Sequence, residues 1–167
     1  MTDVVDASSN QHPLIAWAAK KLRWLDGVSY AFLAIPLRFA TAIIFWNSGT
    51  AKLANWETTL FMFTDEYKVP LLPPEIAAYM AAAVELTMPV LLVVGLATRP
   101  ATLVLLSMTA VIQIFVYPQA WPTHIQWAAM LLVLLCRGPG RLSLDYLLWR
   151  RFGSLAGVAP HGRDVNK

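Results

Sequence analysis

Five polar side chains interrupt long apolar stretches of this sequence, and their types are those that exchange protons or bind anions. They are Arg38, Lys52, Glu85, Gln113 and His124. Glu85 lies in the middle of residues 76–96, a stretch with no other charged residue. An ionisable group at the centre of a bilayer costs about 2.5–3.5 kcal/mol on insertion scales, so it seldom faces lipid. We therefore expect Glu85 to have a partner inside the protein, and Arg38, in another apolar stretch, is the predicted one.

The chemistry expected of this set is proton exchange beside a bound polar or anionic ligand. Glu85 and His124 are the predicted catalytic residues, because carboxyl and imidazole groups act as general acids and bases. The predicted substrate-binding residues are cationic, amide or aromatic, namely Arg38, Lys52, Gln113, Trp46, Tyr117 and Trp121. No metal site is predicted, since His12 and His161 lie in polar flanking segments. One cysteine, Cys136, excludes both a disulfide within the chain and a metal site built from cysteines.

Each of these residues also has a structural interpretation. A buried Arg38–Glu85 pair can fix the register of two helices without doing chemistry. Lys52 can extend its ammonium to the membrane surface, and Gln113 can form a hydrogen bond between helices. His124, near Trp121, can be an interfacial residue. The tryptophans and tyrosines predict an aromatic belt at one membrane surface.

The elements that must position these groups are membrane-spanning helices. Apolar residues make up 57% of the chain and charged residues 14%, against roughly 25% in soluble domains. Four apolar stretches are candidate spans, at about 29–51, 76–96, 101–116 and 120–136. The sequence therefore predicts an all-α membrane protein, a four-helix transmembrane bundle. The polar groups fall mostly in the half of the bundle nearer the first and third loops.

Positive charges predict the orientation of this bundle. Basic residues precede the first span, occupy the second loop and follow the fourth span: Lys20, Lys21, Arg23, Arg99, Arg137, Arg141, Arg150 and Arg151. The third loop has neither lysine nor arginine. Both termini and the second loop are therefore expected in the cytoplasm, with the polar site opening on the outer side.

The flanking segments predict amphipathic helices at both ends of the bundle. Residues 12–26 place Leu14, Ile15, Leu22 and Leu25 on one helical face, and 143–152 begin with a capping serine and end in basic residues. The expected organisation is an N-terminal tail and interfacial helix at 1–27, a four-span domain at 28–142, and a second interfacial helix with a flexible tail at 143–167. Residues 55–74 are expected to form a lid-like loop with a short helix.

Several segments, in order, resemble the DoxX family of small four-helix bacterial membrane proteins. They are Arg38 with the Gly49-Thr-Ala-Lys52 sequence, Glu85 with the Gly95-Leu-Ala-Thr-Arg99 turn, and Arg137-Gly-Pro-Gly with Ser143-Leu-Asp145. The resemblance covers residues 38–145. It implies a protein of the bacterial inner membrane, linked to sulfur-compound, thiol or quinone redox chemistry.

The leading functional hypothesis is therefore a redox-associated membrane subunit that binds quinone or a small anionic substrate in the outer half of the bundle. Its electrons would come from a membrane partner protein or a bound cofactor, because the sequence shows no redox group of its own. Whether the chain is itself an enzyme is left open. The alternatives are a non-catalytic accessory or assembly subunit with a structural ion pair, and a small-solute permeation protein working as a homo-oligomer. Nothing in the sequence indicates nucleic-acid binding.

Overall fold

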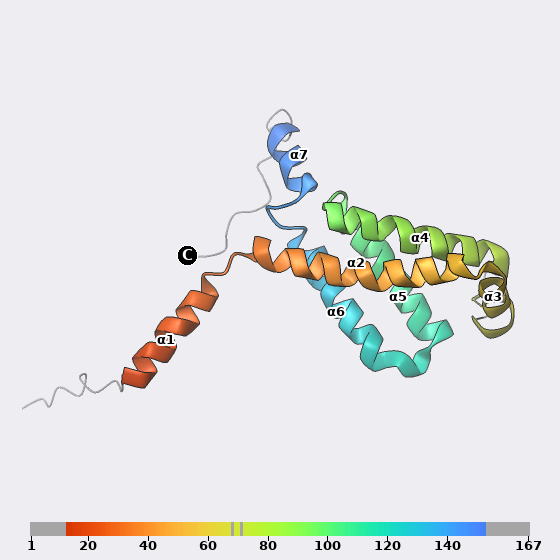
Figure 1. Ribbon diagram of the computed structural model, residues 1–167, viewed down its shortest axis with the longest axis horizontal. Coiled ribbons are helices and arrows are strands. Elements are labelled where there is room, and N and C mark those ends of the chain that lie inside the picture. Colours follow the sequence, from red (N-terminus) through yellow and green to blue (C-terminus); the bar gives the residue numbers. More distant parts are fainter. Residues whose placement is uncertain (1–12, 68, 71, 153–167) are drawn as a thin grey trace, which may run out of the picture. The chain divides into compact units, whose positions relative to one another are not determined.

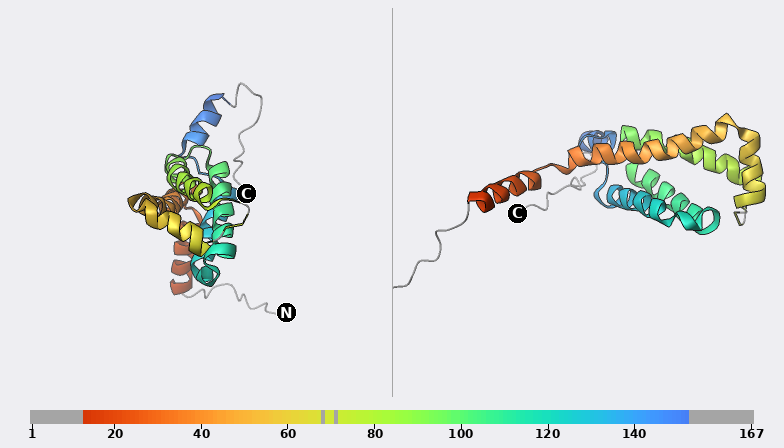
Figure 2. Two further views of the ribbon diagram at one scale, coloured as in Figure 1. Left: turned by 90° about the vertical axis from the view of Figure 1, so that its right-hand side faces the viewer. Right: turned by 60° about the horizontal axis from the view of Figure 1, so that its bottom comes forward.

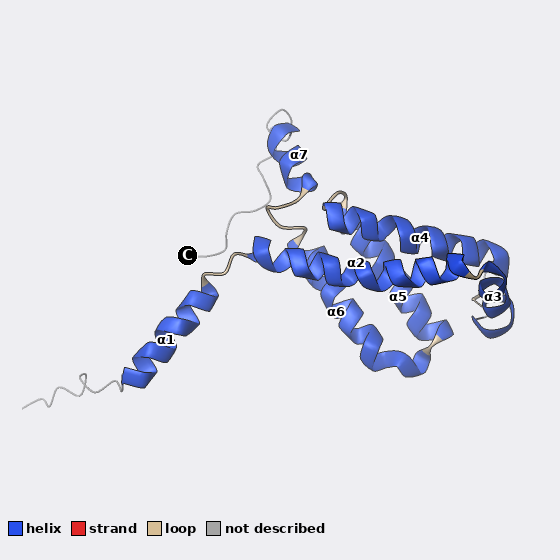
Figure 3. Cartoon of the chain, viewed as in Figure 1, coloured by secondary structure: helices blue, strands red, loops and turns tan. Residues whose placement is uncertain are grey.

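All regular structure in the described part of the chain is helical (Figures 1 and 3). The computed structural model describes residues 13–67, 69–70 and 72–152. The α-helices are α1 (Pro13–Asp26), α2 (Tyr30–Ala54), α3 (Trp56–Phe61), α4 (Pro74–Val94), α5 (Thr98–Val111), α6 (Trp121–Arg137) and α7 (Leu144–Phe152). Two π-helical segments, η1 (Met62–Tyr67) and η2 (Ile112–Val116), and the 3₁₀ turn η3 (Pro118–Ala120) complete them. This confirms the all-α prediction, and the predicted tails at 1–12 and 153–167 lie outside the described residues.

Within the described residues, three helices are long and apolar enough to cross a membrane. They are α2 with 25 residues, α4 with 21, and α5 continued by η2 over Thr98–Val116 with 19. Helix α6 has 17 residues, below the ~20 that a span usually needs. The prediction of an all-α membrane protein therefore holds with three candidate spans.

The chain divides into two compact units, Met1–Tyr30 and Ala31–Lys167. Helix α1 belongs to the first and is considered by itself. In the second, α2 and α4 run antiparallel, side by side in Figures 1 and 2. Gly49 of α2 permits this approach, because a Cβ atom placed there would lie 3.0 Å from the Glu85 Cβ and the Leu86 side chain. A larger residue at this position would therefore require the Leu86 side chain or the α4 backbone to shift by a few tenths of an ångström.

Apolar side chains from four helices form the core of the second unit. The buried members are Ala42 and Phe45 of α2, Leu92 of α4, Ala101 and Leu105 of α5, and Leu131 of α6. Trp127 packs its ring edge-on against Phe45, with 5.7 Å between ring centroids. Although α6 is short, it thus packs as a full member of the bundle.

The segment between α2 and α4 folds back over one end of the bundle, as the sequence predicted. Asn55 caps α3, accepting a hydrogen bond from the Thr58 N–H at 3.2 Å. Phe63 of η1 is buried against Ala77 and Ala78 of α4. We call α3 and η1 together the α3–η1 cap.

The opposite end is closed by the turn between α4 and α5. Gly95 ends α4 with φ +72°, a left-handed conformation that favours glycine. The Ala97 and Thr98 N–H groups at the start of α5 donate to the Asp145 carboxylate, at 2.7 and 2.9 Å. A carboxylate at a helix N-terminus satisfies free N–H groups and the helix dipole together. Asp145 thereby fixes α7 to the α4–α5 turn. Ser143 caps α7, accepting from the Tyr146 N–H at 3.2 Å, which confirms the predicted cap.

Candidate functional site

Beneath the α3–η1 cap, Lys52 of α2 and Glu85 of α4 form an ion pair. The Lys52 Nζ lies 2.7 Å from one carboxylate oxygen of Glu85 and 2.9 Å from the other. Ser48 completes the group, since its hydroxyl donates to Glu85 at 3.0 Å and lies 2.9 Å from the Lys52 Nζ. The Glu85 side chain is 2% exposed and that of Lys52 is 18% exposed. The carboxylate is thus enclosed, while its cationic partner keeps a path to the surface.

The direction of helical side chains explains why Lys52 reaches Glu85. The Cα–Cβ bonds of a helix tilt toward its N-terminus, so a long side chain extends back over the preceding turn. Lys52 therefore extends along α2 toward Ser48, four residues earlier on the same face. Gly49, between them, brings α4 close enough for Glu85 to meet both groups.

The predicted Arg38–Glu85 pair is wrong. Arg38 is buried at the other end of α2, where its guanidinium donates to backbone carbonyls: Leu92 at 2.6 Å, Leu142 at 2.8 Å, Pro139 at 3.4 Å, and Val93. Arg38 precedes Lys52 by 14 residues, about 21 Å along a helix. Its side chain points toward the N-terminus of α2, and therefore away from Glu85. The carbonyls at the end of α4 are suitable acceptors for it, because they lack their usual donor four residues later in the helix.

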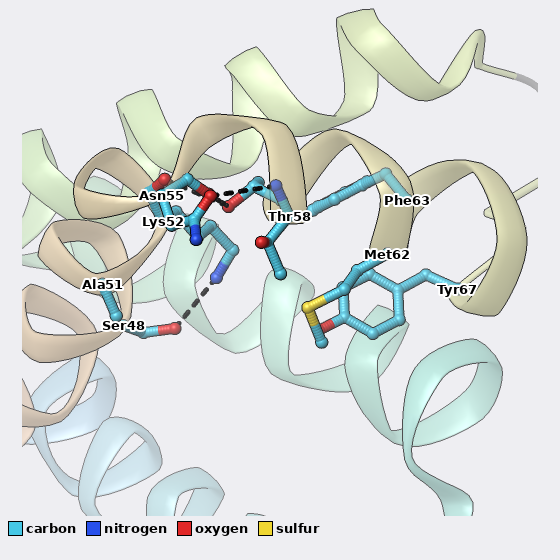
Figure 4. Close-up of a pocket in the computed structure, with 9 residues that line it drawn as sticks. Ser48, Ala51, Lys52, Asn55, Thr58, Met62, Phe63 and Tyr67 are labelled. Carbon is cyan, nitrogen blue, oxygen red and sulfur yellow. Dashed lines mark hydrogen bonds between the residues drawn. The ribbon is translucent and has the colours of Figure 1, made fainter.

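A cavity of about 250 Å³ opens beside the ion pair (Figure 4). It is lined by the end of α2 and by the α3–η1 cap, namely Ser48, Ala51, Lys52, Asn55, Thr58, Thr59, Met62, Phe63 and Tyr67. An ammonium, an amide and hydroxyl groups share this lining with a thioether and aromatic rings. Such a mixture suits a planar ligand that carries oxygen atoms.

Two further polar contacts lie where η1, η2 and the start of α6 come together. The hydroxyl of Tyr67, which lines the cavity, is 3.1 Å from that of Tyr117. The Nδ1 atom of His124, which is buried, lies 2.7 Å from the Gln113 Oε1. The Gln113 amide also donates to the Pro118 carbonyl at 2.8 Å. The tyrosine pair therefore links the cap to the chain after α5, and His124 has an amide partner.

The Tyr67–Tyr117 contact leads to a prediction about pH. Burial, and then the hydrogen bond with Tyr117, raise the pKa of Tyr67 above the ordinary value of 10.0. Because the folded state holds this proton more tightly, the resulting stability is complete below pH 10 and is lost as the pH rises above it. A titration of tyrosinate absorbance should show one late-ionising tyrosine, which Tyr67→Phe removes and Tyr146→Phe retains. If the Tyr67→Phe change instead removed an ionisation step at lower pH and left the late step in place, this assignment would be wrong.

The structure brings some of the predicted site residues together and separates others. Lys52 and Glu85 form an ion pair beside the cavity, His124 contacts Gln113, and Arg38 lies apart from both pairs. Trp46 and Trp121 are 43% and 56% exposed, as belt residues would be. Tyr67, one of the aromatic residues predicted for the belt, lines the cavity, whereas sequence reasoning missed Asn55 and Thr58 as lining residues. The only signal for them was the unusual length of the segment that contains them.

Comparisons with known proteins agree with this architecture. The DoxX family model matches residues 33–118, from α2 to the start of η3. An uncharacterized protein of Haemophilus influenzae is 28% identical over 137 residues, covering 74% of this chain and 88% of that protein. No solved structure matches. Because the family match covers more than half of the sequence, including both residues of the Lys52–Glu85 pair, this chain belongs to the DoxX family.

Proposed function

We propose that this protein is a redox-associated membrane subunit that binds a quinone head group in the cavity beside Lys52 and Glu85. The observation that carries the proposal is that an ion pair with a buried carboxylate lies beside a cavity of about 250 Å³. An apolar cavity of about 150 Å³ holds benzene in another protein, so this volume suits one substituted ring. The quinone tail would extend into the lipid.

The residues support binding of a ligand that accepts hydrogen bonds. The Lys52 ammonium has three N–H donors, directed at Ser48 and at the two oxygens of Glu85. A carbonyl oxygen entering the cavity would take one of them, in place of the Ser48 hydroxyl. Phe63 and Met62 would contact the faces of the ring.

The same pair supports proton delivery to that ligand. Reduction of a quinone to a quinol consumes two electrons and two protons. The Lys52 ammonium, which lines the cavity, would donate a proton to the ligand oxygen, and the Glu85 carboxylate would accept protons from water and pass them on to Lys52. His124, whose Nδ1 lies 2.7 Å from the Gln113 amide oxygen, would be a second group able to exchange protons. The two electrons would come from a partner protein in the membrane.

The proposed setting is the bacterial inner membrane. The family membership and the three long apolar helices support it. We propose that α6, at 17 residues, is a fourth span, since 17 is the lower end of the range observed for such helices. Four spans and the positive-inside rule then place both termini in the cytoplasm and the α3–η1 cap on the outer side.

Binding of a short-chain ubiquinone analogue to the purified full chain in nanodiscs tests the proposal. We expect saturable binding of one molecule per chain. Ala51→Trp should weaken it at least tenfold, or about 1.4 kcal/mol, because the indole fills the cavity without removing either charge. Lys52→Met should weaken it too.

The matched control is Ala40→Trp, which places the same bulk on an exposed position of α2 away from the cavity. This variant should bind like the unchanged protein. Equal binding by the Ala51→Trp variant would contradict the quinone site. That result would favour the accessory role, in which the Lys52–Glu85 pair only joins two helices.

A further inference from the structure

Helix α1 exposes an unusual amount of apolar surface for a helix considered alone. Among the side chains of α1 that the structure describes, five large apolar ones are more than half exposed: Ile15 at 59%, Trp17 at 62%, Leu22 at 62%, Trp24 at 71% and Leu25 at 57%. A helix of 14 residues is marginally stable in water without a surface to pack on. Some surface outside this helix must therefore cover its apolar side.

The helix has two chemically distinct sides. At 3.6 residues per turn, Ile15, Leu22 and Leu25 share one face. The basic residues Lys20, Lys21 and Arg23 lie away from the centre of that face. The separation is between aliphatic and cationic residues, because Trp17 and Trp24 lie on the basic side. Helices with aliphatic residues on one side and cationic residues on the other are typical of the plane of a membrane surface, where tryptophan is also enriched.

Two tryptophans and two lysines form a shallow hollow on the basic side of α1. Its lining is Trp17, Lys20, Lys21 and Trp24, which follow one another at spacings of three, one and three residues. The Lys21 ammonium lies 5.8 Å from the centre of the Trp17 ring. Ammonium and indole N–H groups are all hydrogen-bond donors, so the hollow suits an anion with several oxygen atoms.

The charge of α1 also favours an anion. Residues 13–25 contain three cationic side chains and neither aspartate nor glutamate, and Asp26 is the first acidic residue after them. Lysines and arginines near a membrane surface attract acidic lipids, each adding to the binding.

The connection to α2 indicates which surface is within reach. Only residues 27–29 separate α1 from α2, a candidate membrane span. Three residues extend over about 10 Å at most, so the C-terminal end of α1 cannot move far from a membrane surface. We propose that α1 is a binding site for anionic phospholipids. Ile15, Leu22 and Leu25 would lie at the boundary of the acyl chains, and a lipid phosphate would bind in the hollow lined by Trp17, Lys20, Lys21 and Trp24.

Amide hydrogen exchange of the full chain in nanodiscs tests this site. In nanodiscs of phosphatidylcholine with phosphatidylglycerol, α1 amides should exchange at least about tenfold more slowly than in phosphatidylcholine alone, because three cations add their attraction. The difference should shrink at high salt. The triple variant K20Q/K21Q/R23Q should abolish it, with exchange in α4 unchanged.

The control is R150Q/R151Q, which removes two charges from α7 and should keep the difference in α1. Equal exchange of α1 in both lipid compositions would overturn the proposal. So would a difference that persists in the triple variant. Protection of α1 in phosphatidylcholine by added inorganic phosphate would assign the hollow to a free anion, and would also overturn the lipid site.

Discussion

Replacing Lys52 by methionine is expected to lower the free energy of unfolding by about 3–5 kcal/mol, the usual cost of removing one partner of a buried ion pair. The change leaves the Glu85 carboxylate, 2% exposed, without its cation. Glu85→Gln should cost less, because the remaining Lys52 ammonium is 18% exposed and can turn toward water. The double variant Lys52→Met/Glu85→Gln should recover most of the loss, since it leaves neither charge buried alone.

Unfolding of the four proteins in one detergent measures this double-mutant cycle. Ser48→Ala serves as the control, because it removes one neutral hydrogen-bonding group and should cost only about 1 kcal/mol. If the two single changes add up in the double variant, the two side chains are not coupled and the pair has been misidentified. The double variant should also lose quinone binding although it is stable, which separates stability from function.

The second large effect is expected at Arg38. Its guanidinium joins α2 to the end of α4 and to the segment between α6 and α7. Hydrogen bonds to charged groups contribute about 1.5–3 kcal/mol each, so Arg38→Met should lose at least ~3 kcal/mol. Arg38→Lys should restore little, because one ammonium cannot reach the carbonyls of both Leu92 and Leu142 as the guanidinium fork does.

Chemical unfolding and limited proteolysis check this prediction together. Residues 138–143 should be cleaved faster in the Arg38→Met variant, because the Leu142 and Pro139 carbonyls lose their donor. Arg99→Met is the matched control, since Arg99 is exposed and donates to Cys136 at a longer 3.4 Å. A loss no larger than in this control would contradict the role of Arg38. The folded fraction should still bind quinone, because Arg38 lies far along α2 from the cavity.

The sequence alone predicted the helices well, for a physical reason. The apolar stretch of α4 begins after Pro73 and ends at Gly95. A backbone embedded in a membrane forms helices because its N–H and C=O groups must pair with one another inside the same segment. The expected burial of Glu85 was also correct, because the cost of exposing a carboxylate to lipid holds for any arrangement of the helices. The membrane assignment needed no knowledge of tertiary contacts.

The partners of the charges could not be predicted in the same way. The choice between Arg38 and Lys52 depends on where each side chain points along its helix. The tilt of helical side chains toward the N-terminus favours Lys52. The carbonyls at the end of α4 then account for the position of the Arg38 guanidinium. Both effects are local rules, and applying them to antiparallel helices would have identified the correct pair.

The cavity was beyond sequence reasoning. It forms because the α3–η1 cap packs Phe63 against Ala77 and Ala78, which leaves Tyr67 facing the end of α2. A π-helical segment such as η1 has no clear sequence signal, although such segments are frequent at functional sites.

The residues behind the DoxX resemblance fall into two groups at opposite ends of the bundle. Lys52, Gly49 and Glu85 form the site, whereas Arg38, Gly95, Ser143 and Asp145 hold the opposite end together.

Photo-crosslinking with a light-activated short-chain quinone analogue tests the central claim most directly, because it reports where the ligand lies. Labelled peptides from the full chain in nanodiscs should map to residues 48–67, at the end of α2 and in the α3–η1 cap. An excess of unlabelled quinone should prevent the labelling, and so should the Ala51→Trp change. Labelling confined to the exposed faces of the helices, or labelling that persists in the Ala51→Trp variant, would contradict the proposed site.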